Sequence, residues 1–194
     1  MHYIVGLGNP GDKYKNTRHN VGWAVLDYFI EHERLPNPVE SAQFSGSISQ
    51  GVILAEEVAV FFPGTFMNKS GSAVRKLVSR EEVGDLVVVY DDVDLPIGEL
   101  KISIGRGAGG HNGVASIIDA LGSKDFVRVR VGIAPVSFWT GMVRRPAAAA
   151  LSRYVLGTFT RKEEGKLEKI KEDIRQALKI IITDGVDAAM NQYN

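Results

Sequence analysis

Short apolar runs alternate with amphipathic segments along the whole chain. Residues 3–7 have the pattern of a buried strand followed by glycine, and 86–89 is an unbroken apolar run, as in strands covered on both faces. Further strands are predicted at 44–55, 58–62, 101–104 and 127–131. In the last of these, valine alternates with Arg128 and Arg130, so both arginines should leave the same face of the strand.

Apolar residues at helical spacing predict helices between these strands. Their stripes include Val21 and Val25, Ala73 and Val74, Val114 and Ile117, and Leu167, Ile170, Ile174 and Leu178. Thr160 and Glu163 have the spacing of a capping box, which begins the last helix, and Gly185 stands where that helix should end. Strands mixed with helices throughout predict an α/β fold with a mixed, mostly parallel twisted sheet flanked by helices.

Chain length sets the expected number of domains. A domain of about 150 residues already buries roughly 70% of the surface that its unfolded chain exposes, so 194 residues suffice for a single domain spanning 1–194. The segment 136–153 contains an alanine tract at 147–150, and we expect this segment to be a mobile loop.

Composition excludes several classes of protein. Apolar residues make up 44% of the chain, close to the globular average, which argues against disorder. No apolar run approaches the roughly 20 residues of a membrane-spanning helix, and the first residues lack the features of a signal peptide. Cysteine is absent, which removes disulfides, thiolate metal sites and a cysteine nucleophile. We therefore expect a cytoplasmic protein without a membrane partner.

Charge is distributed unevenly, although 23 basic and 23 acidic residues give a net charge of zero. Residues 1–99 carry 8 basic and 14 acidic groups, whereas 100–153 carry 8 basic and 2 acidic groups. A basic middle segment on a neutral protein favours a local anionic partner. A solvated basic face would give the same counts, so charge alone leaves both interpretations open.

The glycine pattern of dinucleotide-binding proteins, G-x-G-x-x-G, occurs at 6–11 and again at 105–110. No helix is predicted directly after the first copy. The second copy lies between a strand and a helix, but it lacks the later acidic residue that would contact a ribose. We therefore expect no nicotinamide or flavin cofactor, and the second copy instead offers backbone N–H groups to an anion.

Histidine is the most promising catalytic residue type in this chain. The serine elbow G-x-S-x-G, the phosphate loop and the zinc motif H-E-x-x-H are all absent. His2 and His32 fit structural or solvated positions, and His111 lies in a glycine-rich loop. His19 differs because it lies in a polar loop just before a helix, so its imidazole is a candidate general base.

Asp91 follows the buried strand at 86–90, and ligands of open α/β sheets bind outside the carboxyl ends of strands. A carboxylate there would hold one imidazole nitrogen as N–H and leave the other to take a proton from water. Asp92 and Asp94 extend the cluster to D-D-V-D, a set that also fits magnesium. No phosphate-transfer motif accompanies the cluster, so we expect no metal.

Several motifs resemble those of bacterial-type peptidyl-tRNA hydrolases. They are GLGNPGDKYKNTRHNVG at 6–22, TFMNKSGSAV at 65–74, YDDVDLPIG at 90–98, GGHNG at 109–113, YVLGTF at 154–159, and TDG with AMN at 183–191. Their order and spacing match the family almost end to end. This family cleaves the ester between a peptide and the terminal ribose of a tRNA, which recycles tRNA that left the ribosome prematurely. The resemblance implies the same activity here, in a monomer that needs no cofactor.

The resemblance also implies roles for single residues. His19 resembles the general base, Asp91 its orienting partner, and Asn9 the contact with the peptide backbone near the ester. Such an ester hydrolysis needs activated water, a donor for the developing oxyanion and a clamp on the acyl group. Asparagine amides supply a donor and an acceptor without adding charge, which suits the last two tasks.

The tRNA end is matched by a second group of residues. Asn68 and Asn112 resemble the amides that place substrate and water, and Tyr14 and Phe66 resemble the aromatic contacts of the tRNA end. Candidates for phosphate contacts are Lys101, Arg106, Arg128, Arg130, Arg144 and Arg145, of which Lys101 and Arg130 lie nearest the motifs. Where relatives usually carry two further basic residues, this chain has Phe62 and Ser103.

Other interpretations stay open at this point. A non-catalytic RNA-binding relative of the same fold would keep the basic surface and could lose His19 or Asp91; both are present, which favours an enzyme. Asn9 and Asn112 could equally shape turns, and Asn68 could cap a helix.

Overall fold

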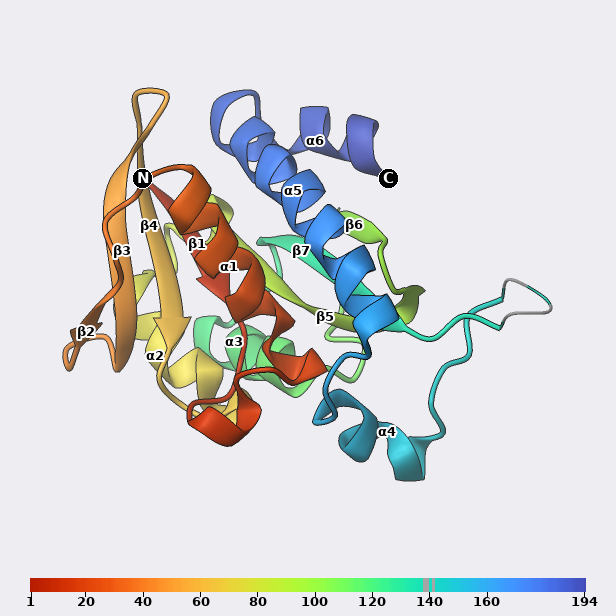
Figure 1. Ribbon diagram of the computed structural model, residues 1–194. Helices are drawn as coiled ribbons and strands as arrows, with labels where there is room; N and C mark the ends of the chain where they lie inside the picture. Colours follow the sequence, from red (N-terminus) through yellow and green to blue (C-terminus); the bar gives the residue numbers. More distant parts are fainter. Residues whose placement is uncertain (138–139, 141) are drawn as a thin grey trace.

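The computed structural model describes residues 1–137, 140 and 142–194. Within them, seven strands form one sheet in the order β2-β3-β4-β1-β5-β7-β6 (Figure 1). The strands are β1 (His2–Gly6), β2 (Val39–Ser41), β3 (Gly46–Ile53), β4 (Glu56–Pro63), β5 (Leu86–Pro96), β6 (Leu100–Ile104) and β7 (Val127–Ala134). Parallel pairings join β4, β1, β5 and β7, and antiparallel pairings add β3, β2 and β6. The predicted α/β class with a mixed sheet is confirmed.

Helices cover both faces of the sheet (Figure 1). They are α1 (Val21–His32), α2 (Ser70–Leu77), α3 (Asn112–Leu121), α4 (Ala148–Val155), α5 (Arg161–Thr183) and α6 (Val186–Tyr193), with 3-10 turns η1 (Asp12–Tyr14), η2 (Arg18–Asn20), η3 (Met67–Lys69) and η4 (Val83–Asp85). On one face α1, α5 and α6 form a core that includes Val25, Phe29 and Ile174. On the other face α2 and α3 pack through Val74 and Ile117. The central strands are therefore internal, as their unbroken apolar runs predicted.

The carboxyl ends of the parallel strands meet at one edge of the sheet. The Leu7 N–H still donates to the Val89 carbonyl at 2.9 Å, and β1 makes no strand pairing with β5 beyond this point. β5 continues beside β7 as far as Asp92 and then shifts its register. The sequence predicted that this strand ends before Asp91, which is wrong: β7 pairs with β5 past that residue, so the strand extends to Pro96.

The ends of the long helix α5 agree with the sequence. Thr160 and Glu163 form the predicted capping box, and Gly185, with a φ of 90°, donates its N–H to the Ile180 carbonyl at 3.0 Å. The helix α6 that follows was not predicted. No helix in the described part of the chain is long and apolar enough to cross a membrane.

The segment 136–153, which the sequence predicted as a mobile loop, is only partly irregular. It contains most of α4, and residues 138–139 and 141 of the segment lie outside those that the structure describes. Its mobility stays a prediction.

Gly22 sets how closely α1 approaches the sheet. A Cβ atom at this position would lie 2.4 Å from the Val89 carbonyl oxygen and 2.7 Å from the Leu7 nitrogen, both of them backbone atoms that cannot rotate away. Only glycine therefore lets the first turn of α1 rest on the strands β1 and β5. This contact also fixes the height of η2, which precedes α1, above the sheet.

We predict that Gly22→Ala lowers the free energy of unfolding by about 1–3 kcal/mol, the usual cost of overpacking a tight site. Gly84→Ala is the matched control, because nothing lies within 4 Å of a Cβ at that position and its φ is not positive. The control should change stability by less than about 0.5 kcal/mol. Urea denaturation of both variants measures their free energies of unfolding. Equal values for Gly22→Ala and Gly84→Ala would contradict the close approach of α1 to β1 and β5.

Candidate active site

A cavity of about 1030 Å³ opens at the carboxyl edge of the sheet. Its walls come from the loop after β1, from η3, from β5 and β6, from the glycine-rich loop before α3, and from α4. The residues that the sequence singled out for chemistry meet here: Asn9, His19, Phe66, Asn68, Asp91, Lys101, Asn112 and Arg130 all line the cavity. Tyr14 lies beside it, against Phe66.

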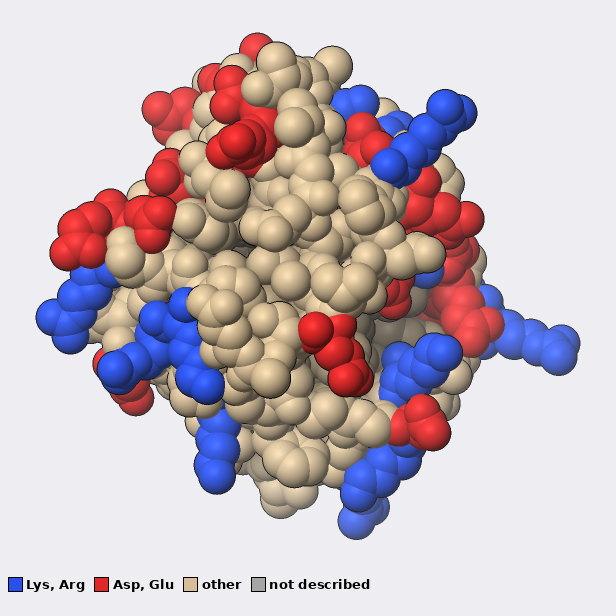
Figure 2. Space-filling model, turned by 90° about the vertical axis from the view of Figure 1, so that its left-hand side faces the viewer, with Lys and Arg blue, Asp and Glu red and all other residues tan. Residues whose placement is uncertain are grey.

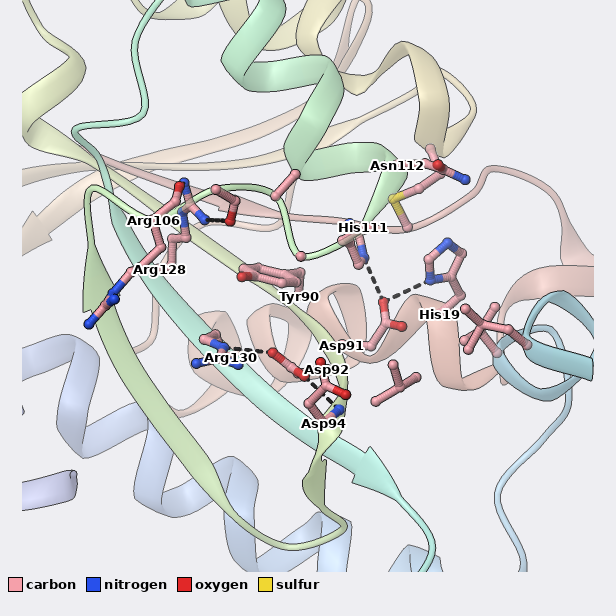
Figure 3. Close-up of a pocket in the computed structure, with 18 of the residues that line it drawn as sticks. His19, Tyr90, Asp91, Asp92, Asp94, Arg106, His111, Asn112, Arg128 and Arg130 are labelled. Atoms are coloured by element: carbon pink, nitrogen blue, oxygen red, sulfur yellow. Dashed lines mark hydrogen bonds and ion pairs between the residues drawn. The ribbon is translucent and has the colours of Figure 1, made fainter. Parts of the chain in front are cut away.

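His19 and Asp91 are in direct contact. The distance from His19 Nδ1 to Asp91 Oδ1 is 2.8 Å, and the Asp91 side chain is only 2% exposed (Figure 3). Alternation along β5 explains the meeting, since Val87 and Val89 face the α1 side of the sheet and Asp91 is next in that series. Because β1 no longer runs beside β5 at this level, η2 can bring His19 onto the carboxylate.

His111 is a member of this site that the sequence did not identify. Its Nε2 lies 3.0 Å from the same oxygen, Asp91 Oδ1, and its Nδ1 accepts the Val114 N–H at 3.3 Å as the N-cap of α3 (Figure 3). An imidazole that accepts on Nδ1 carries its proton on Nε2, so His111 donates to Asp91. The only local signal in the sequence was its place just before a predicted helix. β6 is antiparallel to β7 and ends at the opposite edge of the sheet, so the glycine-rich loop has to bring His111 back to Asp91.

Asp91 is ionised between the two imidazoles. Burial raises the pKa of its carboxyl, but the charges and hydrogen bonds of His19 and His111 outweigh burial and hold that pKa well below its ordinary value. An ionised carboxylate only accepts, so His19 donates Nδ1–H to it, and in the neutral ring the lone pair is then on Nε2. No described residue hydrogen-bonds this nitrogen, which leaves it available in the cavity as a base.

Asn9 is held firmly on the cavity wall. Its Oδ1 accepts the Met67 N–H at 2.8 Å, and its own backbone N–H and carbonyl bond the side-chain amide of Asn20, each at 2.9 Å. With Oδ1 fixed on Met67, the amide nitrogen of Asn9 is left as a donor toward the cavity. Asn68 and Asn112 also line the cavity, and both are exposed.

Two aromatic rings flank the cavity mouth. The rings of Tyr14 and Phe66 meet edge to face, with centroids 6.3 Å apart, and Phe66 is 53% exposed. The described residues leave part of the Phe66 ring uncovered, so the ring can stack on a bound group. The sequence placed both residues at the same contact, and the structure brings them together.

The basic residues along the cavity differ in their availability. Arg130 donates Nε to Asp92 Oδ2 at 2.6 Å and keeps a quarter of its side chain exposed, and Lys101 is exposed. Arg128 is 1% exposed and donates to the carbonyls of Gly107, at 2.7 Å, and Arg106. A phosphate contact is therefore wrong for Arg128, which anchors the glycine-rich loop instead.

Charge elsewhere on the surface is more scattered. Figure 2 shows the side of the molecule formed by β2 and β3, where a broad uncharged area separates small acidic and basic groups, and this face has no continuous basic surface. The basic segment 100–153 instead contributes Lys101, Arg106, Arg130 and Arg145 to the walls of the cavity. Phe62, at one position usually basic in relatives, is buried against the edge of Trp23.

The same groups could be considered as metal ligands. His19, Asp91 and His111 offer ligand atoms within 4.8 Å of one another, and such a set suits transition metals. A metal on His111 Nε2 would move the proton to Nδ1, against the Val114 N–H that Nδ1 accepts. Asp92 and Asp94, for their part, pair with Arg130 and Arg145. The hydrogen bonds thus fit a proton-transfer site better than a metal site.

The fold and the site define a single-domain α/β enzyme with a histidine–carboxylate pair at the carboxyl edge of its sheet. The family model described as peptidyl-tRNA hydrolase matches residues 3–194. The peptidyl-tRNA hydrolase of Roseiflexus sp. (strain RS-1) is 42% identical over 197 residues, which cover 100% of this chain and 86% of that one. The peptidyl-tRNA hydrolase of Syntrophomonas wolfei is 39% identical, with both chains fully covered.

Solved structures agree with these relatives. The crystal structure of peptidyl-tRNA hydrolase from Acinetobacter baumannii superposes with a TM-score of 0.87 at 27% identity, covering 100% of this chain and 94% of that one. The chain belongs to the peptidyl-tRNA hydrolase family. The expectation of an enzyme is thereby confirmed, and it replaces the alternative of a non-catalytic RNA-binding relative.

Asp91 should make stability depend on pH in a defined direction. Its folded pKa lies below the unfolded value of about 4, so the ionised carboxylate stabilises the fold at neutral pH, and this contribution is lost as the pH falls below about 4. We predict that the stability difference between the wild type and Asp91→Asn is larger at pH 6 than at pH 3. Urea denaturation at both pH values measures it.

The exposed Asp85 provides the control for this measurement. The stability of Asp85→Asn should differ little from that of the wild type, and this difference should be nearly the same at pH 6 and pH 3. A constant difference for Asp91→Asn from pH 6 to pH 3 would be inconsistent with the contacts to the two imidazoles.

Proposed function

We propose that this enzyme hydrolyses the ester between a peptide and the 3′-terminal ribose of a tRNA, with His19 as general base and Asp91 as its orienting partner. One observation carries the proposal: Asp91 Oδ1 holds His19 Nδ1 at 2.8 Å, which directs the basic nitrogen Nε2 into a cavity lined by asparagine amides. Membership of the family supplies the substrate class.

The chemistry follows from the hydrogen bonds. His19 Nε2 takes a proton from water as the water oxygen attacks the ester carbonyl carbon. The tetrahedral intermediate then collapses, the bond to the ribose 3′-oxygen breaks, and His19 returns the proton to that oxygen. Asp91 stabilises the imidazolium that exists between these two steps. A positioned base of this kind contributes roughly a hundred- to ten-thousand-fold in rate.

The asparagines would recognise the acyl group. The amide nitrogen of Asn9 faces the cavity as a donor for a peptide carbonyl near the ester, and Asn68 and Asn112 would place the substrate and the attacking water. A wall of neutral amides suits a neutral peptide bond. A free aminoacyl-tRNA carries a charged α-amine, which such a wall solvates poorly.

The tRNA would bind through stacking and charge. Tyr14 and Phe66 offer ring faces to the unpaired bases of the 3′ end, at about 1–3 kcal/mol per base. Lys101 and Arg130 lie on the cavity wall as phosphate contacts. We further propose that the enzyme is a monomer in the cytoplasm. We also propose that it works without a metal, because Asp91 Oδ1 already accepts hydrogen bonds from both His19 and His111.

His19→Ala should lower kcat by roughly a hundred- to ten-thousand-fold on a peptidyl-tRNA, because water then lacks its base. His32→Ala is the matched control, since His32 lies at the exposed end of α1 and bonds only a backbone carbonyl. Release of free tRNA from an N-acetyl-aminoacyl-tRNA measures both rates. Equal rates for His19→Ala and the wild type would overturn the assignment.

Arg130→Glu should weaken tRNA binding and flatten its salt dependence, by about one unit of the log–log slope for each phosphate that the protein no longer neutralises. Arg80→Glu makes the same change of charge on an exposed residue outside the cavity, so its slope should stay close to that of the wild type. Titration of a non-hydrolysable tRNA complex at several salt concentrations gives both slopes. An unchanged slope for Arg130→Glu would remove Arg130 as a phosphate contact.

A further inference from the structure

Arg18 is a buried charge that the proposed chemistry does not use. The residue is 7% exposed, although it immediately precedes His19 in the turn η2. Its NH2 donates to Glu163 Oε2 at 2.9 Å, and its NH1 lies 3.4 Å from the Tyr154 carbonyl oxygen. The guanidinium also stacks over the ring of Tyr154, with its carbon 4.4 Å from the ring centroid.

These contacts reach the segment that joins α4 to α5. The backbone N–H of Arg18 donates to the Gly157 carbonyl at 2.9 Å, and Thr17 pairs with Thr158 as an isolated bridge. Glu163 is the capping-box residue of α5, and its Oε2 accepts the Thr160 N–H at 2.7 Å as well as the Arg18 guanidinium. Arg18 therefore ties the catalytic turn both to the end of the α4 wall and to the start of α5.

Three consecutive side chains of η2 thus bind three different parts of the fold. Arg18 binds the junction of α4 and α5, His19 binds Asp91 on β5, and Asn20 binds the backbone of Asn9 after β1. A single 3-10 turn has little stability of its own, so its position must come from such anchors. The contacts of His19 and Asn20 both lie on the strand side, and Arg18 is the anchor on the opposite side.

We propose that Arg18 is a positioning residue, which holds η2 between the sheet and the α4–α5 junction so that His19 Nε2 meets the attacking water in line with the ester. A catalytic group needs its productive geometry to within about 0.5 Å, and a 1 Å misplacement can cost about a hundredfold in rate. The guanidinium suits this task because its fixed fork reaches a carboxylate and a carbonyl at once. The inference rests on the proposed role of His19.

The experiment compares Arg18→Met with Arg175→Met. Arg175 on α5 pairs with Glu33 and Glu172, is similarly sheltered, and does not line the cavity. Both variants lose a guanidinium that joins two elements, so both should lose stability. Rates are measured on an N-acetyl-aminoacyl-tRNA, at a temperature where thermal melts show each variant folded. We expect Arg18→Met to lower kcat by about ten- to a hundredfold with KM changed less than about threefold, and Arg175→Met to leave kcat within about twofold.

Two further variants test the route of the effect. Arg18→Lys keeps the charge beside Glu163 but loses the fork, so it should recover part of kcat. Glu163→Gln in the Arg18→Met background should cost little more in kcat, because the ion pair is already broken. Equal kcat values for Arg18→Met and Arg175→Met would overturn the proposal. Failure of the proposed function looks different, because the wild type and His19→Ala would then release tRNA equally.

Discussion

One buried carboxylate organises this active site. Asp91 accepts from His19 and His111 on a single oxygen, with a side chain that is 2% exposed. An ionised group so far from water is stable only when donors surround it. The two imidazole N–H groups meet that need, and in doing so they fix both ring tautomers and orient His19. The arrangement that keeps the charge stable is therefore the same one that makes a base.

The fold has to leave room for this group. β1 stops beside β5 after Val89, so β5 carries Asp91 past the end of its neighbour while β7 still supports it from the other side. Gly22 then lets α1 rest on the strands, which brings the preceding turn down to the carboxylate. His111 arrives from the opposite face of the sheet, at the first turn of α3. The site thus depends on elements from both layers of helices, and neither layer alone would complete it.

The sequence predicted those parts of the site that depend on residues close together in the chain. Apolar periodicity gave most of the strands and helices, and the position of Asp91 after an apolar run together with His19 before a helix indicated the pair. His111 was missed because a histidine among glycines has no periodicity around it, and only the tertiary fold shows that α3 begins beside Asp91. Arg128 was named as a candidate phosphate contact because alternation shows which face of a strand a side chain leaves but not what covers that face. Here the glycine-rich loop covers it.

The unusual sharing of one carboxylate by two histidines has a catalytic consequence. Before the proton transfer, Asp91 accepts one N–H from each ring, and His19 acts as a base in its neutral form. When His19 takes a proton from water, its hydrogen bond to Asp91 becomes an ion pair in a sheltered place, where such an interaction is stronger than in water. His111 cannot take over this role, because its Nδ1 faces the Val114 N–H and its Nε2 already holds a proton. The stabilisation therefore grows mainly as the transition state forms, which is the condition for an interaction to raise kcat and not only binding.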